Sequence, residues 1–423
     1  MNAPQFIVAL SFLVLSARAD DWPQWRGPQR DGVWREQGIM ETFPPEGLKI
    51  LWRVPSGGSF PSPVVADGRV YLHDVELAYP HVHERVRCFD AVTGKVQWTY
   101  AYDADYPDWA YQPEQNGGPV SSPAVVDGRL YALGANGDAL CLSAATGELL
   151  WHRDLATDDH VAGMTCRASP LVDGDRVILV VGGKPGACVV ALDRNTGQDV
   201  WKALDEPVAN SSPILITAGG ARQLIIWTGE SVSSLNPATG TAYWREALKT
   251  SNNDDNATPV WSEDRLLVSG LMFKLAADKP AATVIWPENR GVTKRILSST
   301  SSPVLMGDAI YSATNRGELV CLDARTGAQL WATDKVTARK TGPSIHITPH
   351  ADTAFLYTDE GMLIHAKLTP AGYEEISRTK LVDPFYLFGG HKLSWAPAAF
   401  ANRCVFVATQ RELICASLAA EAP

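Results

Sequence analysis

One ten-residue phrase recurs five times in this chain, and it limits the possible folds more than any other feature of the sequence. Each copy starts with an apolar residue, passes through a polar turn closed by Thr-Gly and ends on tryptophan. In such a turn an aspartate side chain bonds its own backbone, and the glycine takes the left-handed conformation. The copies read "FDAVTGKVQW", "LSAATGELLW", "LDRNTGQDVW", "LNPATGTAYW" and "LDARTGAQLW", with the glycines at Gly94, Gly147, Gly197, Gly240 and Gly327 and the tryptophans at Trp98, Trp151, Trp201, Trp244 and Trp331.

A second recurring phrase precedes each turn, as in "SPVVADGRVYL" from Ser62 and "SPAVVDGRLYAL" from Ser122. Its apolar residues alternate with period two around an Asp-Gly-type turn, a pattern typical of a hairpin of half-buried strands. Together the two phrases make a unit of four short strands, which we name A to D in chain order. Successive tryptophans, including Trp286 in a degenerate copy, lie 42 to 53 residues apart. Four strands at this period predict one propeller blade per step.

The ends of the chain supply the last blade. Blade 7 keeps the four-strand pattern but has Ile376 where tryptophan is expected, and the C-terminus then offers only three strands. The stretch "LKILWRV", residues 48–54, has the character of a D strand and carries Trp52 at the right place. The sequence therefore predicts an all-β eight-bladed propeller over residues 48–418, closed by N- and C-terminal strands in one sheet. An extended segment, 20–47, would precede it and a tail, 419–423, would follow.

The N-terminus predicts export. Ten apolar residues from Phe6 are followed by Ala17-Arg18-Ala19, which is typical of a signal peptide over residues 1–19 that is cleaved near Ala19. A membrane-spanning helix needs about 20 apolar residues, so we expect no transmembrane segment in the mature chain and a periplasmic or secreted protein. The formal net charge is −10, with 37 Lys and Arg against 47 Asp and Glu, and no basic run occurs. Nucleic acid is therefore not an expected partner.

Four of the seven cysteines occupy the same place in successive repeats, namely Cys88, Cys141, Cys321 and Cys415. Equivalent positions on neighbouring packed sheets lie about 10 Å apart, beyond the ~7 Å Cα separation that a disulfide bridges. We therefore expect these four side chains to be reduced core residues.

The repeat resembles the tryptophan-docking repeat of pyrroloquinoline-quinone-type (PQQ-like) eight-bladed propellers, and "DWPQWRGPQRDGVW" is similar to the start of secreted bacterial members. The resemblance covers residues 20–418. It extends to two subfamilies: the quinoprotein alcohol dehydrogenases, and the non-enzymatic propeller subunit of the outer-membrane-protein assembly machinery. The first implies a quinone stacked between a tryptophan and a disulfide of adjacent cysteines, with Ca²⁺ held by Glu, Asn and Asp. No two cysteines are adjacent here, so no cofactor is predicted, and PQQ and Ca²⁺ are implied by the resemblance alone.

The sequence predicts no catalytic residue and no metal site. The nucleophile elbow G-x-S-x-G, the zinc motif H-E-x-x-H and the phosphate loop are all missing. His81 and His83 alternate as metal ligands on a strand would, but a third ligand is not evident, and an exposed loop is the expected setting. The acidic, amide-rich stretch "SNNDDN", 251–256, offers oxygen ligands of the kind Ca²⁺ takes, but it equally suits a solvated loop.

The connections from strand D to the next strand A are long and rich in aromatic and charged residues, whereas the other hairpins are short. In a propeller these connections converge at one mouth of the central channel, and loops on a rigid scaffold commonly carry binding. The candidate binding residues are Trp109, Tyr111, His160, Asn253, Asp254, Asp255, Arg290, Arg295, Lys340, His391 and Trp395. The aromatic side chains are suited to anchoring a partner or to plugging the channel.

The leading prediction is an exported, non-catalytic propeller that binds a protein partner or a cell-envelope ligand through this face. Two alternatives stay open: a quinone-dependent dehydrogenase, favoured by the fold, and a carbohydrate-binding or carbohydrate-active propeller, favoured by the aromatic connections.

Overall fold

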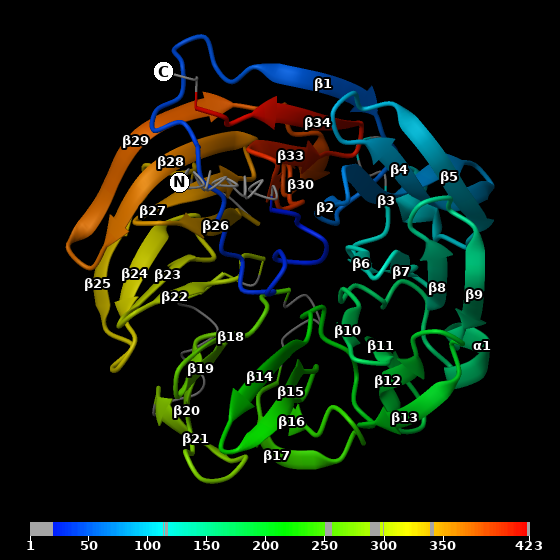
Figure 1. The fold of residues 1–423 in the computed structure, drawn as a ribbon. Coiled ribbons are helices and arrows are strands. Elements are labelled where there is room, and N and C mark those ends of the chain that lie inside the picture. Colours follow the sequence, from blue (N-terminus) through cyan, green and yellow to red (C-terminus); the bar gives the residue numbers. More distant parts are fainter. Residues whose placement is uncertain are drawn as a thin grey trace, which may run out of the picture.

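A computed structural model describes residues 20–112, 114, 117–249, 256–287, 297–298, 300–338 and 342–420. Eight four-stranded antiparallel sheets stand around a central axis like the blades of a propeller (Figure 1). In each blade, strand A lies nearest the axis and strand D forms the outer edge. The predicted all-β eight-bladed propeller is confirmed.

The strands follow the order A, B, C and D in every blade. The first four blades comprise β2 (Val64–Ala66), β3 (Arg69–Ala78), β4 (His81–Asp90) and β5 (Val96–Asp103); β6 (Ala124–Val126), β7 (Arg129–Leu133), β8 (Asp138–Ser143) and β9 (Leu149–Asp154); β10 (Leu171–Asp173), β11 (Arg176–Gly183), β12 (Ala187–Asp193) and β13 (Asp199–Ala203); and β14 (Ile214–Ala218), β15 (Ala221–Trp227), β16 (Ser231–Leu235) and β17 (Ala242–Ala247). The last four comprise β18 (Val260–Ser262), β19 (Arg265–Val268), β20 (Leu271–Leu275) and β21 (Ala282–Trp286); β22 (Val304–Met306), β23 (Ala309–Ala313), β24 (Leu319–Asp323) and β25 (Gln329–Thr333); β26 (Ile345–His350), β27 (Thr353–Thr358), β28 (Met362–Thr369) and β29 (Gly372–Lys380); and β32 (Ala399–Ala401), β33 (Cys404–Ala408), β34 (Glu412–Ser417) and β1 (Ile50–Pro55).

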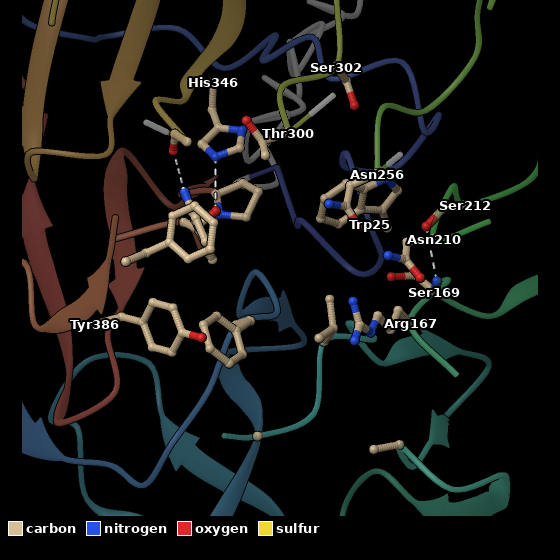
Figure 2. Close-up of a pocket in the computed structure, with 18 of the residues that line it drawn as sticks. Trp25, Arg167, Ser169, Asn210, Ser212, Asn256, Thr300, Ser302, His346 and Tyr386 are labelled. Atoms are coloured by element: carbon tan, nitrogen blue, oxygen red, sulfur yellow. Dashed lines mark hydrogen bonds between the residues drawn. The ribbon is translucent and has the colours of Figure 1, made fainter. Parts of the chain in front are cut away.

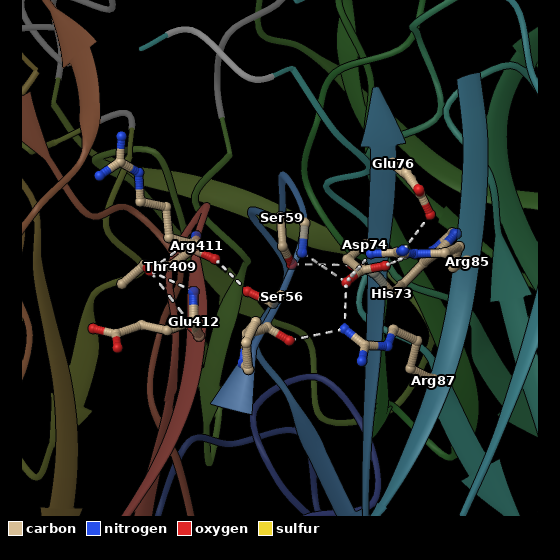
Figure 3. Close-up of polar contacts among 12 residues, drawn as sticks. Ser56, Ser59, His73, Asp74, Glu76, Arg85, Arg87, Thr409, Arg411 and Glu412 are labelled. Carbon is tan, nitrogen blue, oxygen red and sulfur yellow. Dashed lines mark hydrogen bonds and ion pairs between the residues drawn. The ribbon is translucent and has the colours of Figure 1, made fainter. Parts of the chain in front are cut away.

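Blade 8 joins the two ends of the chain, as predicted. Its strand order is β1-β34-β33-β32, and Trp52 of β1 lies opposite Cys415 of β34. The strand begins at Ile50, two residues after the predicted start. The residues that follow β1 bond both blade 8 and blade 1 (Figure 3). Ser56 donates to the carbonyl of Thr409 in blade 8, and Arg87 of blade 1 donates to the carbonyl of Pro55.

The repeated tryptophan joins each blade to the next. Its indole Nε1–H donates to a backbone carbonyl of the following blade at 2.8 to 3.1 Å for Trp52, Trp98, Trp151, Trp201, Trp286 and Trp331. The repeat glycine receives the face of that indole. A Cβ added to Gly147, for example, would lie 2.6 Å from the ring of Trp98. The Thr-Gly turn therefore has glycine for two reasons: its positive φ of 74° and its contact with the tryptophan.

Two blades depart from this arrangement. The indole of Trp244 donates to the side chain of Gln223 in its own blade at 3.0 Å, because blade 5 lacks the Thr-Gly turn that would receive it. Ile376, at the position without tryptophan, is 37% exposed. These two places show that the ring tolerates the loss of single docking contacts.

The first part of the 20–47 segment crosses the centre of the ring, which the sequence did not predict (Figure 1). Its later part runs beside blades 7 and 8, where the Phe43 N–H donates to Ser377 Oγ. Trp22 pairs with Val65 of β2, and the carbonyl of Pro23 accepts from Val125 of β6. Arg30 donates to carbonyls at the inner strands of blades 3 and 4, namely Pro170 at 2.8 Å and Pro213 at 3.1 Å. The segment therefore fastens the inner strands of several blades together from inside the channel.

The remaining features are small. All seven cysteines are buried free thiols, in agreement with the prediction for the four at repeat positions. Three elements that the sequence did not predict lie in D-to-A connections: η1 (Asp108–Tyr111), α1 (Leu155–Asp159) and the hairpin of β30 (Tyr386–Phe388) and β31 (His391–Leu393). Across the described residues, helices are too short and too polar to traverse a membrane.

Candidate functional site

All eight D-to-A connections meet around one cavity of about 490 Å³ at one mouth of the channel. Its lining residues come from 60, 109–120, 164–169, 210–212, 256, 297–302, 342–346 and 386–397, with further contributions from Trp25, Ala135, Ser269 and Asn315. Figure 2 shows their side chains directed toward a common space. Because the connections lie on one face of the propeller, they line one shared cavity.

One repeat position supplies a lining residue in seven of the eight blades. It lies four residues before the first residue of the inner strand, as Asn210 does before Ile214. The set is Phe60, Val120, Arg167, Asn210, Asn256, Thr300 and Trp395. In blade 7 this position falls outside the described residues, and the described lining from that blade is Gly342 and His346.

Serine hydroxyls that follow this position along the chain accept hydrogen bonds from the neighbouring blade. The backbone N–H of Ser122 donates to Ser169 Oγ at 3.0 Å, and that of Ser169 donates to Ser212 Oγ at 2.9 Å. Thr258 N–H donates to Ser302 Oγ at 2.9 Å in the same way. These bonds explain why the Ser-Pro phrase recurs, and they hold the floor of the cavity at a constant spacing.

An aromatic wall forms one side of the cavity. Trp395 lies 5.3 Å from Tyr386 and 4.9 Å from Phe388 between ring centroids, and Phe60 lies 5.1 Å from Tyr386. The indole of Trp395 donates to the carbonyl of Gly342 at 2.7 Å. These rings are therefore held in place before any ligand binds. Burial raises the pKa of Tyr386.

The opposite wall is mostly polar. It carries Arg167, Asn210 and Asn256, together with serine hydroxyls and the indole of Trp25, whereas Thr300 lies beside His346 (Figure 2). Asn210 is 6% exposed, and its Nδ2 has no hydrogen-bond partner among the residues that the structure describes. A buried amide without a partner is costly, so this wall is suited to a ligand that brings an acceptor.

His346 lies between the two walls and is uncharged at neutral pH. Burial lowers its pKa to about 4, and the neighbouring Arg26 guanidinium also lowers it. Its Nε2 is 2.9 Å from the carbonyl oxygen of Trp395, so Nε2 carries the proton and donates while Nδ1 is an acceptor. The ring thus fixes the backbone that carries Trp395.

The structure brings two of the predicted binding residues into the cavity, Trp109 and Trp395. Trp109 is 42% exposed at the rim, whereas Trp395 is half-buried. Three others lie outside its lining: Tyr111 against Tyr79, His160 at the end of α1, and His391 in β31. The remaining six, Asn253, Asp254, Asp255, Arg290, Arg295 and Lys340, lie outside the described residues.

The expected loop position of His81 and His83 is wrong. Both residues lie in β4, where the β3–β4 hairpin extends blade 1, and His83 Nδ1 is 2.8 Å from an Asp103 carboxylate oxygen. In the part of the chain that the structure describes, no three His, Cys, Asp or Glu side chains are grouped as metal ligands.

Sequence reasoning missed several lining residues, including Trp25, Phe60, Arg167, Asn210 and Asn256. Six of the seven residues that precede an inner strand by four places were not selected as candidates, although their common distance from the strand was a signal in the sequence. The candidates were instead selected among the aromatic and charged residues in the middle of each connection.

The cavity does not fit the quinone and metal ion that the resemblance implies. Its described lining contains one cationic side chain, Arg167, and no carboxylate that would hold a metal ion. The adjacent-cysteine disulfide is also ruled out by the sequence. The polar groups of the described lining are hydroxyls, amides, the Arg167 guanidinium and the His346 imidazole, beside aromatic rings.

Comparisons with known proteins agree with the fold. The chain is 25% identical over 234 residues to "Outer membrane protein assembly factor BamB" of Burkholderia pseudomallei, covering 53% of this chain and 58% of the relative. The match thus spans little more than half of the relative's length. A solved BamB from Moraxella catarrhalis covers 89% of this chain, and the chain covers 99% of it, at 16% identity and a TM-score of 0.57.

A dehydrogenase has a similar fold. The quinohemoprotein alcohol dehydrogenase of Comamonas testosteroni covers 95% of this chain, which covers 81% of it, at 15% identity and a TM-score of 0.65. At these identities the solved structures show the fold alone. The family model described as "Outer membrane protein assembly factor BamB" matches residues 82–333, more than half of the chain, and the chain therefore belongs to that PQQ-like propeller family.

Proposed function

We propose that this chain is a non-catalytic binding propeller of the cell envelope, which holds a segment of a partner protein at the mouth where the D-to-A connections meet. The observation that carries the proposal is the cavity of about 490 Å³ to which all eight connections contribute. Its volume lies within the range of about 300–1,000 Å³ that is usual for ligand sites. The name of the family and of its relatives, an outer membrane protein assembly factor, supports an envelope location and an assembly role.

The aromatic wall supports a protein partner. Tryptophan and tyrosine are enriched among the residues that supply most of the free energy of binding at protein interfaces. Trp109 stands at the rim with 42% of its surface exposed, which is the setting of an anchor that a partner covers. Trp395 is bound to Gly342 and packed against Phe388, so it shapes the cavity wall.

A saccharide of the envelope is a second candidate, favoured by one observation. The amide and hydroxyl wall with Asn210 and Asn256 faces the aromatic wall with Tyr386 and Trp395. Such a pair of walls matches a sugar ring, which has apolar faces and a polar edge. Mass spectrometry of small molecules released from the purified protein separates the possibilities, because a stoichiometric glycan supports the second candidate and a stoichiometric quinone overturns the non-catalytic proposal.

The test of the leading proposal compares two substitutions of exposed apolar residues. Trp109→Ala removes the rim anchor, and Val92→Ala is its control because Val92 is 78% exposed in the C–D turn of blade 1, on the opposite face. Affinity purification of each tagged full-length protein from envelope fractions of its host, with quantitative mass spectrometry, measures partner recovery. We expect Trp109→Ala to weaken binding about 30-fold, which corresponds to ~2 kcal/mol for an anchor residue.

The outcome is interpreted with thermal melting curves of the same proteins. Trp109 is 42% exposed and Val92 is 78% exposed, so we expect both melting temperatures to stay close to that of the unsubstituted chain. Equal partner recovery by the two variants would contradict docking at this mouth. Loss of recovery by Val92→Ala alone would place the partner on the opposite face.

A further inference from the structure

The tip of blade 1 stands beside the cavity and has an unusual surface. We define it by two segments, residues 76–84 at the end of the β3–β4 hairpin and residues 103–112 in the connection to blade 2. The segments touch, since Tyr111 OH donates to the carbonyl of Pro80 at 3.1 Å and its ring lies 5.1 Å from that of Tyr79. Trp109 belongs to both the blade 1 tip and the cavity lining.

Three aromatic side chains of the blade 1 tip reach its surface, and a fourth, Tyr106, is buried. Tyr79 is 73% exposed and Trp109 is 42% exposed, while Tyr111 is half-buried between the two segments. Exposed rings of this size are uncommon on a surface that meets only water, and tyrosine and tryptophan are the residues that protein interfaces favour.

The charges of the blade 1 tip are all of one sign. Asp103, Asp105 and Asp108 are exposed, and the two segments contain no Lys or Arg. Within the described chain, neither Asp105 nor Asp108 forms an ion pair. Burial raises the pKa of Tyr111, and Tyr79, Asp108 and Asp105 add to that effect. The next cation along β4 is Arg85, which is already bound to Asp74 at 2.8 Å and to Glu76 at 2.6 Å (Figure 3).

A buried carboxylate keeps this surface in place. Glu84 is 1% exposed, and it accepts from Tyr106 OH at 2.7 Å and from the backbone N–H of Ala135 at 3.1 Å, as well as from Tyr102 OH. The connection that bears Trp109 is thus fixed to both blade 1 and blade 2. A fixed surface loses little conformational entropy when a partner binds.

We propose that the blade 1 tip binds an extended peptide segment rich in Lys or Arg, belonging to the partner that enters the neighbouring cavity. Exposed carboxylates attract the cationic side chains, and the faces of Tyr79 and Trp109 receive them through cation–π contacts. The inference rests on the proposed function because it specifies the chemistry of the same partner.

Fluorescence anisotropy with labelled octapeptides tests the proposal. The probe is four Gly-Arg repeats, and its control is four Gly-Glu repeats. Two protein variants are compared with the unsubstituted chain: Asp105→Asn/Asp108→Asn at the blade 1 tip, and Asp67→Asn/Asp278→Asn at exposed aspartates in turns of the opposite face. Both pairs change the net charge by the same amount, so the comparison removes the general attraction of a cationic peptide to a protein of net charge −10.

We expect the tip pair to weaken binding of the Arg peptide about fivefold or more, and the opposite-face pair to leave it unchanged within a factor of two. Tyr79→Ser should weaken binding to a similar extent with no change in melting temperature, since the side chain is 73% exposed. Raising NaCl from about 50 to about 300 mM should weaken it further, because the salt screens exposed charges. Equal effects of the two aspartate pairs, or equal binding of the Glu peptide, would overturn the proposal.

The two proposals fail separately. If Trp109→Ala abolishes partner recovery while the tip aspartate pair leaves both recovery and peptide binding intact, the mouth is the docking site and its cationic specificity is refuted. If the Arg peptide binds the blade 1 tip but recovery of the envelope partner does not depend on Trp109, the proposed function fails and the cationic site stands.

Discussion

A pair of glycine substitutions isolates the contact that joins neighbouring blades. Gly147 and Gly128 have nearly the same positive φ, 74° and 72°. A Cβ added to Gly147 would lie 2.6 Å from the Trp98 ring, whereas a Cβ on Gly128 would have no atom within 4 Å. Alanine at either position therefore has the same backbone strain, but only Gly147→Ala displaces an indole.

The expected magnitudes follow from these two terms. An alanine held at positive φ costs about 1–2 kcal/mol. Displacing the half-buried Trp98 adds about 1–3 kcal/mol of overpacking and weakens its 3.1 Å hydrogen bond to the carbonyl of Ala144. The free energy of unfolding should therefore fall by about 1–2 kcal/mol for Gly128→Ala and by about 2–5 kcal/mol for Gly147→Ala.

Urea unfolding followed by far-ultraviolet circular dichroism measures both variants under one set of conditions. We expect the unfolding midpoint to fall further for Gly147→Ala than for Gly128→Ala, and Trp98→Ala to remove most of that difference when combined with Gly147→Ala. Equal midpoints for the two single variants would refute the reasoning, because they would show that the tryptophan face contributes nothing beyond the turn itself.

Three further predictions concern ring closure and two buried polar groups. Trp52→Ala should lower the free energy of unfolding by about 3–5 kcal/mol, since this 8% exposed side chain ties β1 to blade 1, and chemical denaturation measures the loss. Glu84→Gln should lower the free energy of unfolding by about 3–5 kcal/mol and lower the melting temperature at pH 7. Burial raises the pKa of Glu84, but hydrogen bonds from His73, Tyr102 and Tyr106 outweigh burial and lower the pKa. The stabilisation by this carboxylate is therefore present above the unfolded pKa of about 4.3 and is lost as the pH falls through the folded pKa. His346 has a folded pKa of about 4 against about 6.5 when unfolded, so the unfolded chain binds the proton first and stability should fall by about 3 kcal/mol as the pH drops from 6.5 to 4. Melting curves across that range should show a smaller decrease for His346→Gln, and an unchanged decrease would mean that this imidazole is not the group responsible.

Most residues that line the candidate site could not be predicted from the sequence. Trp109 and Trp395 were found because aromatic residues in long connections stand out, and both line the cavity. Tyr111, His160 and His391 have the same character and lie elsewhere, since the path of a connection depends on what it packs against. Asn210 and Arg167 were missed because their role comes from their distance to an inner strand, which only the aligned blades reveal.

The sequence by itself determined the number of blades, the partner of β1 and the places of the repeated tryptophan and glycine. Each of these features depends on contacts between adjacent repeats, so a sequence pattern that recurs at a fixed spacing is enough to predict it. Only the tertiary structure decided that the first part of the 20–47 segment crosses the channel and that Trp25 forms part of the cavity lining. The physical reason is that this segment contains no repeat. Arg30 donates to carbonyls of blades 3 and 4 that lie 139 to 183 residues away in the chain, and the Trp34 N–H donates to the carbonyl of Pro349 in blade 7; such contacts exist only once the ring has closed.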